Sequence, residues 1–155
     1  MINYKYPRSF PKAEEIRLHV NGEEVDVLKT NVAYFASASY VGEAKVEITT
    51  ASKAQNVKIS PVRLGLKAEV KANSVTLSLK SNVYLHIEIE GVKLPLFFYG
   101  NPQKEYDGNA TYYFKSGQIY EIGDLIIKDN ESIYIEGGAV VNDWEQKDNR
   151  NRKLL

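Results

Sequence analysis

Apolar side chains recur at every second position along much of the first hundred residues of this chain. Ile16, Leu18 and Val20 alternate with polar residues, and the same spacing returns further along the sequence. The later runs are Val46/Ile48, Val57/Ile59, Val75/Leu77/Leu79 and Val83/Leu85/Ile87/Ile89. A period of two places the apolar side chains of a strand on one face. The pattern therefore predicts strands that each turn one face toward a core.

Turn-forming residues separate these runs at short intervals. Asn21-Gly22 is the strongest hairpin signal, because both central residues of a type I′ turn need positive φ. We expect Val25 and Val27 to return along the partner strand of this hairpin. The other breaks fall at Gly42, Pro61, Asn73-Ser74, Ser81-Asn82 and Gly91.

The sequence gives no strong signal for a helix. A helix of ordinary length, about 12 residues, would show apolar residues at a spacing of three to four, and no stretch does so convincingly. Residues 34–40, rich in Ala and Ser, are expected to form an edge strand or a loop. Residues 14–100 therefore predict a two-sheet antiparallel β-sandwich. Its expected core includes Ile16, Leu18, Val20, Val46, Ile48, Leu77, Leu85 and Ile87.

The rhythm changes after residue 100. Beyond the polar segment 101–109 (NPQKEYDGN), short apolar clusters recur at seven-residue steps, at Ile119, Ile126, Ile133 and Val140. Strands this short suit the coils of a parallel β-helix, in which each coil stacks on the next. A heptad coiled coil would also show seven-residue steps, but Gly and Asp-Asn at the breaks and the β-branched residues argue against a helix.

These changes in pattern divide the chain into four expected segments. Residues 1–100 form a β-sandwich domain, and 101–109 a linker. Residues 110–141 form the first β-helix coil, and 142–155 a polar tail. The expected fold class is all-β, an antiparallel β-sandwich followed by the start of a parallel β-helix.

Composition excludes several classes of site and partner. The 155 residues contain no cysteine and two histidines, which excludes disulfides, thiolate zinc sites, iron–sulfur clusters and a histidine-rich metal site. Twenty basic residues balance twenty acidic ones, whereas nucleic-acid binders carry a basic excess. The longest apolar run, residues 94–99, is far below the roughly 18 residues of a membrane helix. We expect no cofactor, no metal, no nucleic acid and no membrane.

The compartment is left open by the sequence. Residues 1–8 (MINYKYPR) lack the apolar stretch of a signal peptide. The protein is therefore expected either inside the cell or, if a signal peptide was removed, in a secreted or periplasmic location.

Two segments of the second half resemble a known family. Residues 112–120 (YYFKSGQIY) and 133–141 (IYIEGGAVV) are similar to the opening of the right-handed β-helix in pectin-lyase-like, polysaccharide-degrading proteins. Within them, glycoside hydrolase families 49 (dextranase, isopullulanase) and 28 (polygalacturonases) are the relevant groups. Upstream, residues 57–61 (VKISP), 75–79 (VTLSL) and 96–102 (LFFYGNP) resemble the β-sandwich that precedes the helix in those enzymes.

The resemblance implies a role without catalysis for this stretch. Family 28-like enzymes carry their catalytic carboxylates several coils further along, in Asn-x-Asp, Asp-Asp and Gly-His-Gly contexts, and none of these occurs here. No residue is carried over as catalytic. The expected function is a non-catalytic accessory or capping domain of a glycoside hydrolase-like β-helix protein, whose longer parent would hydrolyse a polysaccharide. The alternatives are an independent carbohydrate-binding module and a structural, surface or phage-type β-helix protein.

Candidate carbohydrate-binding residues lie on one strand and in the tail. Tyr84, His86 and Glu88 alternate with apolar residues, so they project from the face opposite the core. An aromatic ring beside polar groups can hold a sugar by stacking and hydrogen bonding, although sandwich outer faces often look like this without binding anything. Trp144 either stacks on a sugar or caps the open end of the coil.

A single coil leaves apolar residues to be covered, because stacked repeats need neighbours. Ile126, Ile133, Ile135 and Val140 are expected to bury themselves against the sandwich, the tail or a second chain. We expect the coil to dock on the sandwich and its open end to drive self-association.

Overall fold

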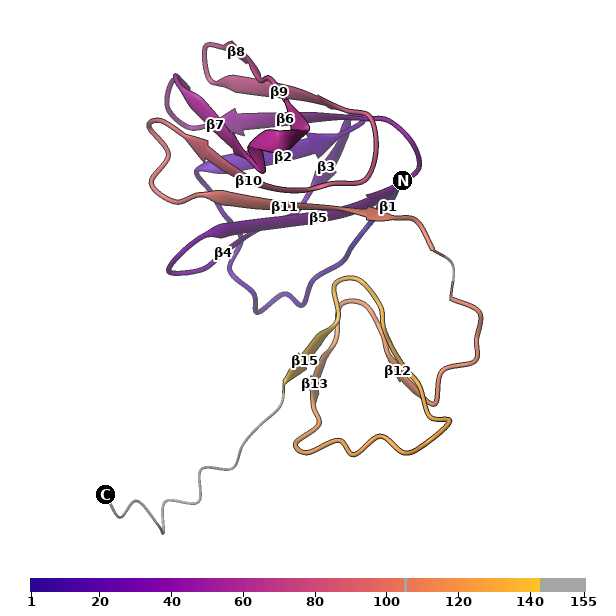
Figure 1. Ribbon diagram of the computed structural model, residues 1–155. Helices are drawn as coiled ribbons and strands as arrows, with labels where there is room; N and C mark the ends of the chain where they lie inside the picture. The colour runs from indigo at the N-terminus through magenta and orange to yellow at the C-terminus, as the bar shows by residue number, and fades with distance from the viewer. Residues whose placement is uncertain (105, 143–155) are drawn as a thin grey trace, which may run out of the picture.

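Two sheets packed face to face make up the first hundred residues of the computed structural model, which describes residues 1–104 and 106–142 (Figure 1). Sheet A has the order β1-β5-β11-β10-β7, with β4 also paired to β5; sheet B has the order β3-β2-β6-β9-β8. The strands of sheet A are β1 (Ile2–Asn3), β4 (Val27–Lys29), β5 (Tyr34–Tyr40), β7 (Val57–Ser60), β10 (Tyr84–Ile89) and β11 (Leu96–Pro102). Those of sheet B are β2 (Ile16–Val20), β3 (Glu23–Val25), β6 (Ala44–Thr50), β8 (Glu69–Lys71) and β9 (Ser74–Leu79).

The core lies between the two sheets and follows the alternation in the sequence. Along β10, Leu85 and Ile87 are buried, whereas Tyr84 and Glu88 are exposed. All eight expected core residues are at most 2% exposed, so the sandwich prediction is confirmed. In the described part of the chain, no α-helix occurs, and no helix is long and apolar enough to cross a membrane; η1 (Val62–Leu64) is a single 3-10 turn.

Two local expectations are corrected. Residues 34–40 form the central strand β5 rather than an edge, and β5 pairs parallel with β11, so sheet A is not wholly antiparallel. Asn21 and Gly22 have the positive φ values of 51° and 83° that the hairpin needs. Val25 continues that hairpin in sheet B, but Val27 lies in sheet A, because the chain crosses between the sheets at Asp26.

One coil of parallel β-structure follows the sandwich. Its strands are β12 (Tyr112–Phe114), β13 (Ile119–Glu121), β14 (Ile133–Ile135) and β15 (Val140–Asn142). Strand β14 stacks on β12 and β15 stacks on β13, and in both pairs the partners are 21 residues apart (133 − 112 and 140 − 119). The three seven-residue steps in the sequence therefore add up to one turn of the coil.

The apolar cluster around Ile126, residues 125–127, forms no strand. In the same register, Ile126 would pair with positions 105 and 147 (126 − 21 and 126 + 21), which lie outside the described residues. Ile126 is instead 77% exposed.

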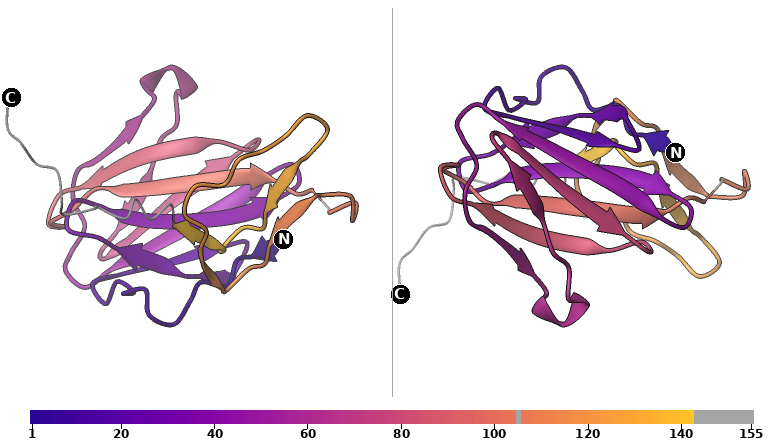
Figure 2. Two further views of the ribbon diagram at one scale, coloured as in Figure 1. Left: turned by 90° about the horizontal axis from the view of Figure 1, so that it is seen from below. Right: turned by 90° about the horizontal axis from the view of Figure 1, so that it is seen from above.

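The N-terminal segment connects the sandwich to the coil. We call residues 2–5 the strap: β1 pairs with β5, placing Ile2 opposite Ser39, and Tyr4 and Lys5 continue toward the coil. The hydroxyl of Ser116 donates to the carbonyl oxygen of Lys5 (3.1 Å). Figure 2, seen from below, shows the coil lying over the end of sheet A that carries the N-terminus.

Candidate functional site

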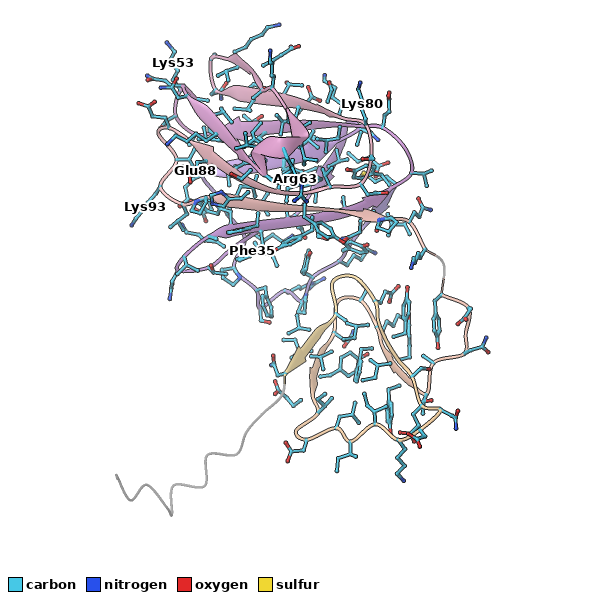
Figure 3. The ribbon with its side chains drawn as sticks, in the orientation of Figure 1. Phe35, Lys53, Arg63, Lys80, Glu88 and Lys93 are labelled. Carbon is cyan, nitrogen blue, oxygen red and sulfur yellow. The ribbon has the colours of Figure 1, made fainter. Side chains whose placement is uncertain are left out.

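An aromatic surface covers part of the outer face of sheet A. Tyr84 is 60% exposed, and it shares this face with His86 and Glu88, as the alternation predicts. Cross-strand pairing sets Tyr84 opposite Tyr99, and His86 opposite Phe97. Figure 3 labels Phe35 and Glu88, which come from different strands of this sheet.

Five rings form the aromatic surface, and each contacts another. We define it as Phe35, Tyr84, His86, Phe97 and Tyr99. The Phe35 and Phe97 rings stack with their centroids 5.5 Å apart, and His86 lies 5.0 Å from Phe97. The Tyr99 ring links Tyr84 to this group, because its centroid lies 6.5 Å from that of Phe35 and 5.7 Å from that of Tyr84. Contacts of this kind between aromatic rings are favourable, so they stabilise the arrangement of the surface.

Three of these rings were missed by the sequence analysis. Phe97 and Tyr99 alternate with the buried Leu96 and Phe98, so period-two reasoning on residues 94–99 would have placed them outward. Phe35 was missed because residues 34–40 were not interpreted as a central strand. Parallel pairing of β5 with β11 brings Phe35 opposite Phe97.

Polar groups border the aromatic surface at Glu88. Its Oε2 lies 4.0 Å from Lys58 Nζ, and its Oε1 lies 3.9 Å from His86 Nδ1. Side chains this exposed interact weakly, so they remain available to hydrogen-bond a ligand. Among the described residues, no group of three His, Cys, Asp or Glu side chains is arranged to hold a metal ion. The surface is thus equipped for stacking and hydrogen bonding.

A second polar region lies where the strap meets the coil. A cleft of about 660 Å³ is lined by the strap, the ends of β5 and β11, and β14 with the residues after it. Tyr4 shares a hydrogen bond with Ser39 through their hydroxyls, and Asn101 Nδ2 donates to Ser37 Oγ (2.9 Å). We call this the junction cleft. It adjoins the aromatic surface, because Ser37 and Asn101 follow Phe35 and Tyr99 by two residues on the same strand faces.

The open face of the coil exposes the residues that were expected to be covered. Ile133 and Ile135 are 37% and 54% exposed, and Val140 is half-buried. The described part of the sandwich therefore leaves these side chains at least partly uncovered, and their burial against the tail or a second chain stays a prediction. Trp144, the remaining candidate sugar-binding residue and expected cap, lies outside the described residues.

Comparison with known proteins gives a structural match alone. No family model matches the chain, and no curated protein matches its sequence. Among solved structures, Dex49A from Penicillium minioluteum aligns with 92% of this chain at a TM-score of 0.61 and 10% identity. At this identity the likeness shows the fold alone, an all-β chain whose sandwich is followed by a coil of parallel β-structure. The chain spans 45% of the length of Dex49A.

Proposed function

We propose that this chain is a non-catalytic accessory module of a carbohydrate-active β-helix protein. In this role, its sandwich would hold a polysaccharide on the aromatic surface, and its coil would join the sandwich to a β-helix. The observation that carries the proposal is the aromatic surface itself, five rings on the outer face of a sheet, each in contact with at least one other. The fold likeness to Dex49A supports the class of parent protein.

The chemistry of the surface suits a sugar chain. The pyranose ring has an apolar face that packs on an aromatic ring, and its hydroxyls need nearby polar partners. Tyr84 and Tyr99 combine both in one side chain, and Glu88 adds a carboxylate acceptor at the border. Two exposed rings, Tyr84 and Tyr99, grouped with three half-buried ones are more than the single scattered aromatic that any surface carries.

Binding is tested with the purified chain and three polysaccharides. Affinity electrophoresis in gels containing dextran, pullulan or polygalacturonate should retard the chain in at least one gel. Tyr84→Ala combined with Tyr99→Ala should weaken retardation about tenfold, the loss typical of an aromatic anchor. Val41→Ala, at a residue 78% exposed in the β5–β6 turn, is the control and should bind as the original. Equal retardation of all three proteins would contradict the proposal.

The absence of catalysis is tested in the same preparations. Long incubation with each polysaccharide should release no reducing ends. Turnover that one Asp or Glu substitution abolishes would replace the accessory role with an enzymatic one.

The independent binding module is the second candidate, and the aromatic surface favours it equally. The two differ in what the coil does. In the accessory role, the exposed Ile133 and Ile135 face a further coil or, in the isolated chain, a second copy. Concentration-dependent association in light scattering, lost in Ile135→Asp, supports the accessory role, whereas a monomer that binds sugar at every concentration supports the independent module.

A further inference from the structure

The junction cleft is a polar cavity that adjoins the aromatic surface. Its volume of about 660 Å³ lies within the roughly 300–1,000 Å³ of small-molecule sites. Residues from four separate parts of the chain line it: the strap, β5, β11 with Lys104, and the coil. A space at the meeting of two structural units is where ligand sites commonly lie.

One wall of the cleft carries a stack of tyrosines. Tyr113 and Tyr134 are neighbours on paired strands of the coil. Tyr106 stacks across both, with centroid distances of 4.7 Å to Tyr113 and 4.5 Å to Tyr134. Tyr106 and Tyr134 both line the cleft, so the stack presents aromatic surface to it.

Glu136 gives the same wall a fixed carboxylate. Its Oε2 accepts hydrogen bonds from the Tyr113 hydroxyl (2.9 Å) and from the backbone N–H of Ser116 (2.7 Å). Among the described residues, both bonds reach this one oxygen, which leaves Oε1 to accept from another donor. The carboxylate is thus held in place by groups that do not use its full acceptor capacity.

The lining favours a neutral, hydroxyl-rich ligand. Tyr4, Ser37 and Asn101, which carry hydroxyl or amide groups, also line the cleft, and Ser39 lines it although it is 2% exposed. The charged residues have both signs, because Lys5 and Lys104 accompany Glu136. Because the charges of the lining have both signs, the cleft does not favour an ionic ligand of either sign. A sugar ring, by contrast, would find both aromatic and hydrogen-bonding partners there.

We infer that the junction cleft is a second carbohydrate subsite, which receives the end of a neutral oligosaccharide chain lying on the aromatic surface. The inference rests on the proposed function. From Phe97 to Asn101 is four residues of extended strand, about 13 Å at roughly 3.3 Å per residue. A short oligosaccharide thus occupies one region, and a longer one reaches both.

The test is a calorimetric titration with neutral α-glucan oligosaccharides of increasing length. Affinity should rise with length and then level off once the cleft is filled. Lys104→Ala combined with Tyr106→Ala should remove the gain of the longer oligomers, about fivefold to tenfold, and leave the affinity for the shortest binding oligomer unchanged. Tyr106→Phe keeps the stacked ring and should retain most of the gain.

The two proposals fail in different ways. If the cleft variant shows the same gain with length as the original protein, the cleft is not a subsite, although the aromatic surface still binds. If Tyr84→Ala with Tyr99→Ala leaves the affinity for short oligomers unchanged, the aromatic surface is not the primary site. If the original chain binds no oligosaccharide, both proposals are wrong. Stronger binding of oligogalacturonides than of neutral oligomers would overturn the ligand class. Far-UV circular dichroism and thermal unfolding confirm that each variant is folded.

Discussion

Gly137 and Gly138 illustrate how single residues set the contact between sandwich and coil. A Cβ built on Gly137 would lie 2.0 Å from a ring carbon of Tyr4, and one on Gly138 would lie 2.3 Å from the carbonyl oxygen of Lys5. Gly138 also has φ of +88°. The pair therefore permits the strap to approach the coil backbone directly, which no side chain would allow.

Replacing Gly138 tests this contact at the residue scale. Gly138→Ala should destabilise the protein by more than the roughly 1–2 kcal/mol of a left-handed residue, because its Cβ also meets backbone. Gly108→Ala is the matched control: its φ is +84°, but nothing lies within 4 Å of the added Cβ. Chemical denaturation measures both, and trypsin cleavage after Lys5 reports release of the strap. Equal losses in the two variants would mean that the close approach is unimportant.

At the scale of the element, β10 separates packing from binding on one strand. Leu85 is 2% exposed in the core, whereas His86 shares the outer face with Tyr84 and Phe97. The two faces of β10 therefore make different contributions: the inner face stabilises the fold, and the outer face belongs to the candidate site.

Alanine substitutions on β10 should show that difference. Leu85→Ala should lower the free energy of unfolding by about 2–5 kcal/mol, through lost burial and the cavity left behind. His86→Ala, next to it, should change the free energy of unfolding by less than about 1 kcal/mol, because its side chain is partly exposed. Urea denaturation measures both. A larger loss for His86 than for Leu85 would invert the assignment of faces.

Some strands could be predicted from the sequence and others could not, and the difference has physical reasons. Runs such as Ile16–Val20 bury one face only, so alternation identified them. Strand β5 is buried on both faces toward its end and uses Ala and Ser, which removes the contrast that period-two reasoning needs. Pairing between distant strands, such as β5 with β11, leaves no local signal. The sequence was enough to predict that Tyr84, His86 and Glu88 share one face of a strand. That Phe35 lies on the same face of the sheet could be known only from the order of the strands.

At the scale of the whole molecule, the ionisation of tyrosines makes the stability of the fold depend on pH in the alkaline range. Burial raises the pKa of Tyr6, which follows the strap in the sequence. The hydrogen bond to Glu136 raises the pKa of Tyr113 in the coil. Burial likewise raises the pKa values of Tyr34 and Tyr40 in β5. These groups belong to the sandwich, the junction and the coil together.

The direction of the pH effect follows from these shifts. A pKa raised on folding means that the folded state holds the proton more tightly, so this stabilisation is fully present below the unfolded value of about 10. It is lost as pH rises through the folded-state pKa values. Denaturation midpoints should therefore fall above about pH 10, while tyrosinate absorbance shows a late-titrating fraction. Tyr6→Phe with Tyr113→Phe should reduce that fraction. A midpoint that rises above pH 10 would contradict the assignment.

The strap also bears on the order in which the protein assembles. Lys5 and its hydrogen-bond partner Ser116 are 111 positions apart in the sequence. Contacts at such separation close slowly, because the intervening chain must first be brought together. The sandwich can form both of its sheets, with the strap paired to β5, before the coil folds against the strap. Formation of the coil, rather than collapse of the sandwich core, would then be the event that fixes the strap between the two parts.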